Sequence, residues 1–348
     1  MLLNELFDFL PKSNRPASYG KSEGKYPFFN SSNIIDKFVD DPDYSGEFLI
    51  IGDGGTGNCK YYNGKFSATD HTYLLKPKKN TNCKLIKYFL EKDNYKILND
   101  GFKGVGIKNV SKSYIQNIEF KKSKKYTDQI MLDVLDSINK LINDNEKHLI
   151  LLDELIKSRF IEMFDDPISN DKCWLTKDLN EITDVRDGTH DSPKYRDSGY
   201  PFVTSKNLIN GKIDFSTCQL ISEEDYLHFN DRSCVDDGDI LMPMIGTIGG
   251  AIMVKKDREF AIKNVALIKF NKDNSIINRT FILNILNSDS MNEYFNNIKK
   301  GGTQNFISLG LIRKIPIIVP PIELQNEFAS FVEQIDKSKF IYYSKYFL

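Results

Sequence analysis

The sequence of 348 residues has few residues that bind metal or form disulfides, and it contains no long apolar run. Its five cysteines stand far apart without a C-x-x-C pair, and its four histidines do not fall at metal-ligand spacings. We therefore expect neither a disulfide framework nor a structural metal. Because no run of about 18 apolar residues occurs and the N-terminus has no secretory signal, we expect a cytoplasmic protein without a membrane span.

Motifs for catalysis are also lacking. There is no G-x-x-x-x-G-K-[ST] phosphate loop, no Asn/Asp-Pro-Pro-aromatic tetrapeptide of amino-methyltransferases, and no convincing Ser/His/Asp, Cys/His or paired-carboxylate arrangement. His71 and His190 have no evident partner in the sequence. The pattern predicts a protein that binds and has no catalytic residue.

One motif could suggest a nucleotide site. Gly52–Gly57 satisfies G-x-G-x-x-G and follows an apolar run at residues 48–51. A nucleotide-binding loop must open a helix, whereas residues 58–65 have turn and strand character. We interpret the motif as a glycine turn that allows close approach of the backbone.

Charge is nearly balanced, with a net charge of −1, but it is segregated along the chain. Residues 101–125 contain seven lysines and one acid, and residues 222–239 contain seven acids and one arginine. Local fields decide whether phosphate is attracted, so the basic segment is a candidate for a nucleic-acid contact. The alternative is that Lys121–Lys125 form a solvated junction between elements.

Most landmarks of the first half of the chain recur in the second half, in the same order. Tyr26–Phe28 matches Tyr200–Phe202 at an offset of 174, Gly46–Gly57 matches Gly238–Gly249 at 192, and Val110-Ser111 matches residues 307–308 at 197. A period of this length indicates a duplicated domain and not a solenoid. The jump from 174 to 192 predicts about eighteen extra residues in one loop of the second copy, near residues 210–236.

Each copy has the pattern of a small α+β module. Strands are expected at residues 47–51, 72–75 and 115–120 in the first copy, and at 240–244, 251–254, 265–270 and 315–319 in the second. Short helices are expected at residues 83–90 and 280–286.

Two longer helices are expected to follow the modules. Residues 126–164 contain no Gly or Pro and carry apolar residues in a heptad frame, which predicts a coiled-coil helix of about 39 residues and about 58 Å. A second helix is expected from Ile322 to about Tyr346, after Pro320-Pro321. We expect the two to pack antiparallel as a rod between the modules, with Asn145 fixing the register or the choice of partner. The predicted seam comprises Met131, Leu135, Ile138, Ile142, Asn145, Leu149, Leu152 and Ile156, with Phe328, Val332 and Ile335 opposite.

The predicted architecture is therefore α+β with a pseudo-two-fold internal repeat. We divide it into a first module at residues 1–122, a central helix at 123–166, a second module at 167–321 and a C-terminal helix at 322–348.

Over nearly its whole length the chain resembles the specificity subunits of type I restriction-modification systems. The resemblance is carried by the doubled Tyr-Pro-Phe with Ser31-Ser32-Asn33 or Ser205-Lys206-Asn207, by Gly238–Leu241, and by Gly302–Ser308. Further carriers are Ile315-Pro316 with Pro320–Gln325, and the hinge Lys157–Pro167. The first copy departs from the pattern in having Gly104–Ser111 without the glutamine and in lacking Pro-Pro before its helix.

The resemblance implies two target recognition domains, each reading one half of a bipartite, asymmetric double-stranded DNA sequence, with the helices setting the spacer. It also implies that the helices dock two methyltransferase subunits carrying S-adenosylmethionine, and that restriction subunits using ATP and Mg²⁺ join them. None of this chemistry would reside in this chain. The C-terminal helix is short, which could weaken the docking of one methyltransferase copy.

Base edges are read by short directed donors and acceptors, and phosphates by Lys, Arg and backbone N–H groups. On that basis the candidate DNA-contacting residues are Ser31, Ser32, Asn33, Thr56, Asn58, His71, Lys103 and Lys108 in the first module, and Thr204, Ser205, Lys206, Asn207, Thr247, Lys263, Asn264, Thr303, Gln304 and Asn305 in the second. Positions where the copies agree, such as Asn33 and Asn207, are expected to stabilise the fold. Positions where the copies differ are expected to select the DNA sequence.

Two other functions stay open from the sequence. A self-sufficient methyltransferase or nuclease would use the Gly52 turn and would bind S-adenosylmethionine alone. A coiled-coil adaptor would bind proteins through its modules and retain no DNA.

Overall fold

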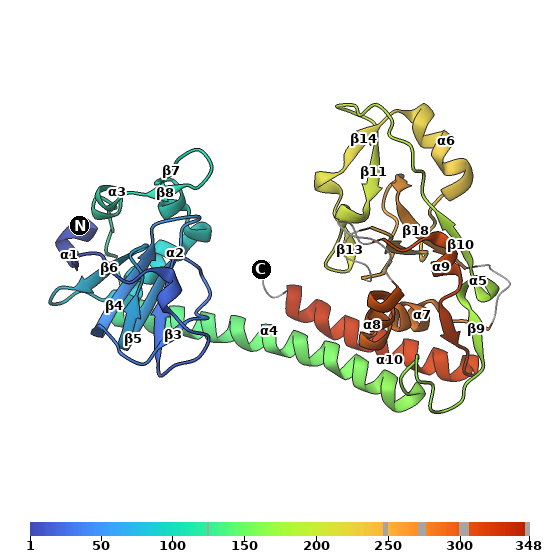
Figure 1. The fold of residues 1–348 in the computed structure, drawn as a ribbon, viewed down its shortest axis with the longest axis horizontal. Helices are drawn as coiled ribbons and strands as arrows, with labels where there is room; N and C mark the ends of the chain where they lie inside the picture. The colour runs from blue at the N-terminus through green and yellow to red at the C-terminus, as the bar shows by residue number, and fades with distance from the viewer. Residues whose placement is uncertain (124, 246–249, 271–275, 299–305, 345–348) are drawn as a thin grey trace. The chain divides into compact units, whose positions relative to one another are not determined.

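The computed structural model describes residues 1–123, 125–245, 250–270, 276–298 and 306–344. The chain divides into two compact units, residues 1–144 and 145–348 (Figure 1). The long helix α4, Asp128–Phe164, contributes residues to both, so the division falls inside the helix and not at its ends. None of the helices in the described part of the chain combines the length and apolar content of a membrane span.

The first unit is built on a six-stranded sheet in the order β1-β6-β4-β5-β2-β3. One of its two middle strands, β4, is buried over residues 48–52, so both sheet faces must be covered. One face packs on α2, α3 and the start of α4, and an aromatic cluster that includes Phe29 and Phe66 covers the other. The elements are α1 Leu3–Leu6, β1 Phe7–Phe9, η1 Ala17–Tyr19, β2 Tyr26–Phe29, β3 Phe38–Val39, β4 Tyr44–Gly52, β5 Cys59–Ala68, β6 Thr72–Pro77, α2 Cys83–Asn99, β7 Phe102–Lys103, β8 Asn109–Val110 and α3 Lys112–Gln116.

The second unit has a four-stranded sheet in the order β10-β18-β15-β16 and a three-stranded sheet in the order β14-β11-β17. The elements are β9 Thr176–Asp178, α5 Leu179–Ile182, β10 Asp184–Asp187, β11 Tyr200–Thr204, η2 Ser205–Asn207, β12 Leu208–Ile209, β13 Lys212–Ile213, η3 Phe215–Thr217, β14 Gln219–Ile221, α6 Glu223–Ser233, β15 Ile240–Pro243, β16 Ile252–Met253, β17 Ala261–Lys263, β18 Val265–Lys269, α7 Arg279–Leu286, α8 Asp289–Ile298, α9 Leu309–Arg313, β19 Pro316–Ile318 and α10 Ile322–Ser344.

The two units repeat the same local structure, which confirms the duplication. In each, the strand with Tyr-Pro-Phe pairs in parallel with a later strand, through Phe28 opposite Ser67 and through Phe202 opposite Ala261. A serine caps the helix that follows the last loop in each, Ser111 for α3 and Ser308 for α9. The N-terminal segments pair alike, Leu2 with Glu119 and Asp178 with Pro316.

The extra residues of the second copy also lie where the offsets predict. They form the β12–β13 hairpin and helix α6, both between β11 and β15. Ser222 caps α6 by accepting a hydrogen bond from the Asp225 N–H, and the acids of its first turn suit a helix N-terminus. The acidic segment is therefore largely this inserted helix.

One strand prediction is wrong. Residues 115–120 were expected to be a strand, but Lys112–Gln116 is the helix α3 and only Glu119 makes an isolated bridge. The Ser111 cap starts the helix and decides the local structure against the apolar run. Helix α2 also continues past the predicted Leu90, with an interruption at Lys92–Tyr95.

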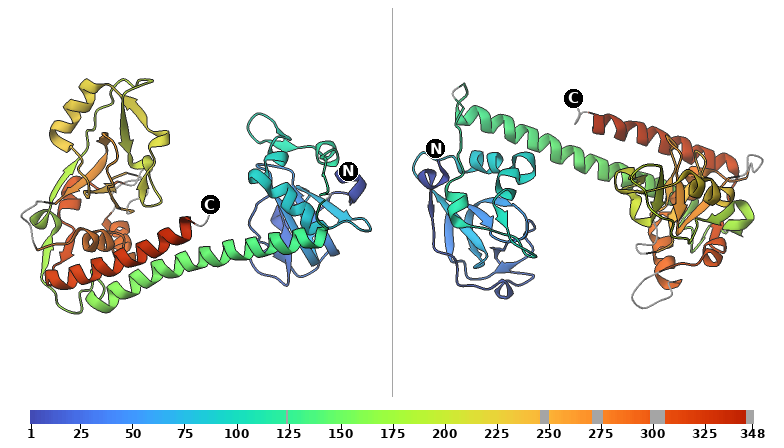
Figure 2. Two further views of the ribbon diagram at one scale, coloured as in Figure 1. Left: turned by 180° about the vertical axis from the view of Figure 1, so that it is seen from behind. Right: turned by 90° about the horizontal axis from the view of Figure 1, so that it is seen from above.

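Within the second unit, α4 and α10 lie side by side and antiparallel (Figure 2). Lys339 pairs with Asp153 at 2.5 Å, and Arg159 pairs with Glu327 at 3.0 Å, so the order of contacts reverses along the two helices. Phe160 packs on Phe328 with ring centroids 5.4 Å apart. The antiparallel pairing is thus confirmed for this half of α4, where Ile156, Val332 and Ile335 share one core cluster.

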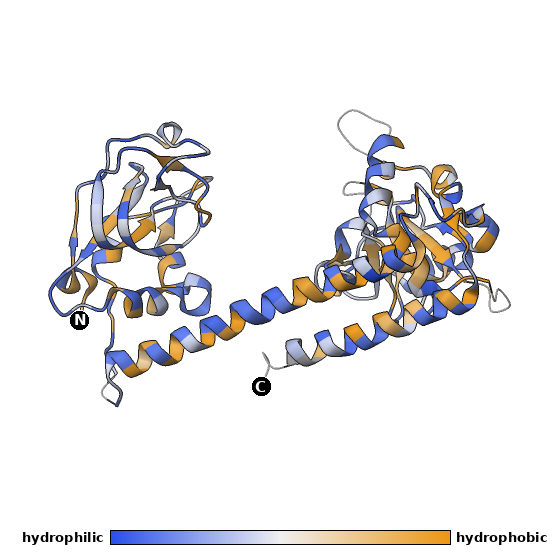
Figure 3. Cartoon of the chain, turned by 90° about the horizontal axis from the view of Figure 1, so that it is seen from below, coloured by the Kyte–Doolittle hydropathy of each residue, from blue (hydrophilic) through white to orange (hydrophobic). Residues whose placement is uncertain are grey.

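The first part of α4 differs from the expected seam. Met131 and Leu135 pack against the core of the first unit, not against α10. Ile138 is exposed, and Ile142, Asn145, Leu149 and Leu152 are half-buried. Figure 3 shows apolar residues recurring along the whole of α4. The apolar stripe of α4 therefore packs against different neighbours along its length.

Candidate nucleic-acid interface

In the first unit, loops that are far apart in sequence converge beside the ends of β2, β4 and β5. The Ser31 hydroxyl donates a hydrogen bond to the His71 carbonyl at 2.7 Å, and the Asp53 N–H donates to the same oxygen at 3.1 Å. The Asn58 side-chain amide donates to the Ser31 carbonyl at 2.8 Å. The candidate residues Ser31, Asn58 and His71 are therefore brought into one cluster.

The β7–β8 hairpin joins this cluster through the glycine turn. The Gly55 N–H donates to the Lys108 carbonyl and the Val110 N–H donates to the Asp53 carbonyl, both at 2.9 Å. Thr56 in the turn and Lys103 and Lys108 in the hairpin are exposed. The turn thus connects the loops with the basic hairpin.

The glycine turn has a packing reason at Gly52. A Cβ atom there would lie 2.8 Å from the Ser31 Cα, so a side chain would push the two loops apart. The turn is followed by strand β5 and not by a helix, as the sequence predicted. The residues after the turn therefore do not supply the helix N-terminus that a nucleotide phosphate would bind.

Buried charge lies under this surface. The Asp53 carboxylate is buried, pairs with Lys12, and lies 3.4 Å from the His71 Nδ1 atom. Lys60 donates to the Asn58 Oδ1 atom at 3.1 Å and to the Asn30 carbonyl at 3.3 Å. Burial lowers the pKa of Lys60 to about 8, because the charged ammonium is partly removed from water.

The second unit repeats the central contact of the cluster. The Ser205 hydroxyl donates to the Asn264 carbonyl at 3.2 Å, as Ser31 does to His71. Thr204 and Lys263 are neighbours in this unit through the parallel pair of β11 and β17. The Lys263 ammonium donates to the Ser192 hydroxyl at 2.6 Å.

The second unit also places a histidine in the cluster. His190 shares a hydrogen bond of 2.6 Å with the Asn264 Oδ1 atom, and its other ring nitrogen lies 3.1 Å from the buried Asp187 carboxylate. Arg232, at the end of the inserted helix α6, pairs with the same carboxylate. His190 therefore has two partners that the sequence did not reveal.

The predicted residues differ in exposure. Asn58 and Asn207 are buried, and Asn207 accepts hydrogen bonds from the Thr204 N–H and hydroxyl, each at 2.9 Å. Buried side chains of this kind hold loops in shape and do not meet a base. Ser32, Asn33 and Lys206 are exposed. Thr247, Thr303, Gln304 and Asn305 lie outside the described residues.

Sequence reasoning missed the buried and ion-paired members of these clusters. They are Lys12, Asp53 and Lys60 in the first unit, and Asp187, His190 and Arg232 in the second. Asp53 lies inside the recognised glycine turn, which was a usable signal. Arg232 lies in the insertion, and no sequence pattern marked it, since its partner Asp187 is 45 residues earlier.

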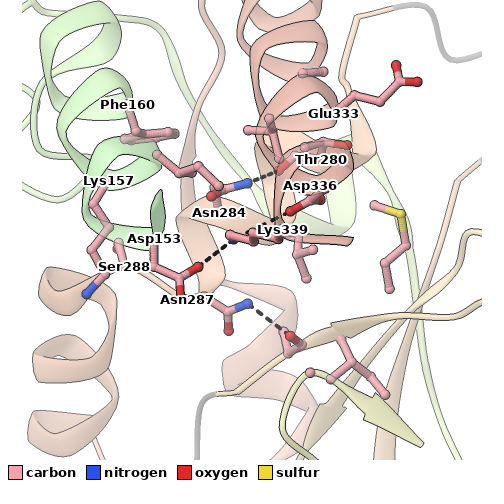
Figure 4. A pocket seen from close by; sticks show the side chains of 18 of the residues that line it. Asp153, Lys157, Phe160, Thr280, Asn284, Asn287, Ser288, Glu333, Asp336 and Lys339 are labelled. Carbon is pink, nitrogen blue, oxygen red and sulfur yellow. Dashed lines mark hydrogen bonds and ion pairs between the residues drawn. The ribbon is translucent and has the colours of Figure 1, made fainter. Parts of the chain in front are cut away.

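A separate groove of about 1460 Å³ lies in the second unit between α4, α10 and the helices α7 and α8 (Figure 4). Its floor includes Ile156, Phe160 and Val332, and Lys339 crosses it to reach Asp153 and Asp336. Among the described residues that line it, the predicted ones, Ile156 and Val332, belong to the helix pair. The groove therefore belongs to the helix pairing and not to the loop cluster.

Two observations concern metal ligands and a buried thiol in the described ranges. There, no group of three or more His, Cys, Asp or Glu side chains could hold a metal ion. Burial raises the pKa of the Cys59 thiol to about 12, so the unreactive thiol form persists at neutral pH.

Comparison with known families decides the identity of the modules. The family described as type I restriction modification DNA specificity domain matches residues 2–152 and again residues 172–341. The chain belongs to this family. As a specificity subunit it is a DNA-recognition protein and not an enzyme, and its two specificity domains correspond to the two copies seen in the sequence.

Similar proteins extend over nearly the whole chain. A protein of Haemophilus influenzae, named as a candidate type I restriction enzyme specificity subunit, is 20% identical over 353 residues, covering 96% of this chain and 86% of its own. The crystal structure of a type I restriction-modification S subunit from M. genitalium has a TM-score of 0.57 at 14% identity, covering 99% of this chain and 91% of its own. The HsdS subunit of Thermoanaerobacter tengcongensis gives a TM-score of 0.43 at 12% identity, with 98% and 90% covered. The M. genitalium likeness shows that the fold is that of an S subunit.

Proposed function

We propose that the chain selects a bipartite, asymmetric sequence in double-stranded DNA, with each specificity domain reading one half. The observation that carries this proposal is the repeated serine-to-carbonyl contact, Ser31 to His71 and Ser205 to Asn264. The backbone junction is the same in the two copies, but its surroundings differ: Asn58 and Lys60 lie beneath the first junction, and His190 lies beside the second. A shared frame with different side chains suits two readers with two target sequences.

The proposal includes partner subunits that supply the chemistry. On α4, Ile130, Val134, Ile138 and Leu141 recur at steps of four, four and three, and all are exposed. Such a face suits a helical partner. We assign it to methyltransferase subunits, two per chain, which carry S-adenosylmethionine, and restriction subunits with ATP and Mg²⁺ complete the complex in the cytoplasm.

The first test is genome-wide mapping of adenine methylation in cells that express the chain together with its cognate methyltransferase subunit. The intact chain is expected to produce a bipartite methylated motif. The I138D/L141D variant is expected to lose the motif and the co-purifying methyltransferase, because two carboxylates would be buried against the partner.

A matched control places acids on another exposed face of the same helix. The N143D/K147D variant is expected to keep both the motif and the complex. If the intact chain assembles with the methyltransferase and no motif appears, the adaptor function replaces the proposal. If the chain alone binds S-adenosylmethionine, the self-sufficient enzyme replaces it.

A further inference from the structure

The tip of the β7–β8 hairpin exposes two aliphatic side chains, one of them fully. Val105 is 106% exposed and Ile107 is 78% exposed, whereas the flanking Phe102 and Val110 are buried in the core of the first unit. Exposing these two aliphatic side chains to water costs free energy, and covering them with a partner would be favourable. The described residues of the first unit therefore leave both side chains largely open to solvent.

The hairpin is held in shape and does not hang as a loose loop. Gly104 has a φ of +140°, and a Cβ there would lie 2.8 Å from the Ile107 carbonyl oxygen, so the turn requires glycine. The base is fixed by the Gly55–Lys108 hydrogen bond and by the bridge between Gly54 and Asn109. The Tyr73 hydroxyl also donates to the Val110 carbonyl at 3.1 Å.

The charge around the tip is of one sign. Lys103 and Lys108 flank the two aliphatic residues and are exposed, and no acid occurs between Asp100 and Glu119. A basic rim around an apolar tip complements a polyanion with an apolar interior. The hairpin is also continuous with the loop cluster of Ser31 and His71 through the glycine turn.

We propose that this hairpin is a groove probe: Val105 and Ile107 enter a groove of double-stranded DNA and cover apolar base edges, while Lys103 and Lys108 neutralise phosphates on either side. The inference rests on the proposed function and adds Val105 and Ile107 to the residues that would read DNA in the first domain. Apolar side chains discriminate bases through contacts such as those with the thymine methyl group. In the second copy the aligned positions are Gly302 and Gln304, so the probe would belong to one half of the target.

The test compares salt dependence in two double variants. The complex of the full chain with its methyltransferase is titrated, at several salt concentrations, with a duplex carrying the methylated motif. V105S/I107S is expected to lower affinity about tenfold or more without changing the salt slope, because no phosphate contact is lost. K103Q/K108Q is expected to lower affinity and to reduce the slope by about two, at about 0.9 per phosphate contact.

The control variant L227S changes an exposed leucine on α6 and is expected to bind as the intact chain does. If the intact complex prefers the motif and V105S/I107S binds within about twofold of it, the groove probe is overturned while the proposed function stands. If the intact complex shows no preference for any duplex, both the groove probe and the proposed function are contradicted. A membrane role would replace the groove probe if the intact chain co-sedimented with vesicles containing anionic phosphatidylglycerol and V105S/I107S did not. In that case the DNA affinity of V105S/I107S would be unchanged.

Discussion

At the scale of single residues, equivalent positions in the two copies have different roles. Asn33 and Asn207 stand 174 residues apart at matching places in the repeat, and both were expected to hold the fold. Asn207 is 4% exposed and bonds to Thr204 and Thr217, whereas Asn33 is exposed. Identity between copies therefore does not by itself separate a structural residue from a surface one.

The first prediction compares these two asparagines. N207A is expected to lower the free energy of unfolding by about 2 kcal/mol, because the Thr204 and Thr217 groups lose a buried partner. N33A is expected to change it by less than about 0.5 kcal/mol. Urea denaturation of the two variants measures the difference, and equal losses would contradict the assignment.

Lys60 supports a second prediction at this scale, on pH. Burial lowers its pKa to about 8 in the folded protein, whereas an unfolded lysine titrates near its ordinary value of about 10.4. Between those values the unfolded chain binds more protons, so the contribution of Lys60 to stability rises with pH, by up to about 1.4 kcal/mol per pH unit. Below about pH 8 Lys60 is charged in the folded protein, and the loss of its hydration lowers the free energy of unfolding by the full amount.

K60M is expected to remove that rise. Urea denaturation at a series of pH values between about 7 and 10 would show the free energy of unfolding increasing more steeply in the intact chain than in K60M. K65M, on the exposed part of the same strand, is the control and is expected to follow the intact chain. Parallel profiles for the intact chain and K60M would show that Lys60 titrates normally.

At the scale of elements, α4 has different neighbours along one continuous helix. Its first turns pack on the first unit, its middle exposes Ile138 and Leu141, and its last turns enter the core of the second unit. Phe160 contacts Phe164, Phe281 and Phe328 there. Aromatic side chains therefore join α4 to α10 and to α7, in the same core cluster as Ile156 and Val332.

A third prediction follows for this aromatic cluster. F160A is expected to lower the free energy of unfolding of the second unit by about 3–5 kcal/mol, because a large cavity opens among three rings. I161A, one position along and exposed, is expected to cost less than about 1 kcal/mol. Similar losses in thermal or urea unfolding would mean that the cluster relaxes around the cavity.

At the scale of the whole molecule, duplication provides two readers with the same frame and separate surfaces. Helix α6 and the β12–β13 hairpin belong to the second copy alone, and α6 supplies Arg232 to its cluster. The apolar β7–β8 tip belongs to the first. The copies have therefore diverged in loops while retaining the same strand pairing and helix caps.

The fourth prediction tests the separation of the readers. S32A/N33A is expected to relax one half of the methylated motif, and K206A/K263A the other, with the spacing unchanged. Each removed base contact costs about 1–3 kcal/mol of discrimination, enough to methylate additional sites. Methylation mapping reads both halves at once, and a variant that relaxed both halves together would show that the copies do not read independently.

Features that depend on local sequence pattern could be predicted before the structure was known. The duplication, the place of the insertion, the long helix and the Gly52 turn were predictable, because hydrophobic periodicity, glycine and proline act locally. The strand expected at residues 115–120 failed because a single cap, Ser111, outweighs a short apolar run.

The contacts between loops could not be predicted from the sequence and depend on the folded arrangement of the chain. The contacts of His190 with Asn264, of Arg232 with Asp187, and of Ser31 with His71 join residues 40 to 74 positions apart. The folded arrangement also decided that Met131 and Leu135 face the first unit while Ile156 faces α10. The physical reason is that an apolar stripe or a polar loop specifies the need for a partner, whereas the partner is set by how strands and helices distant in sequence pack together.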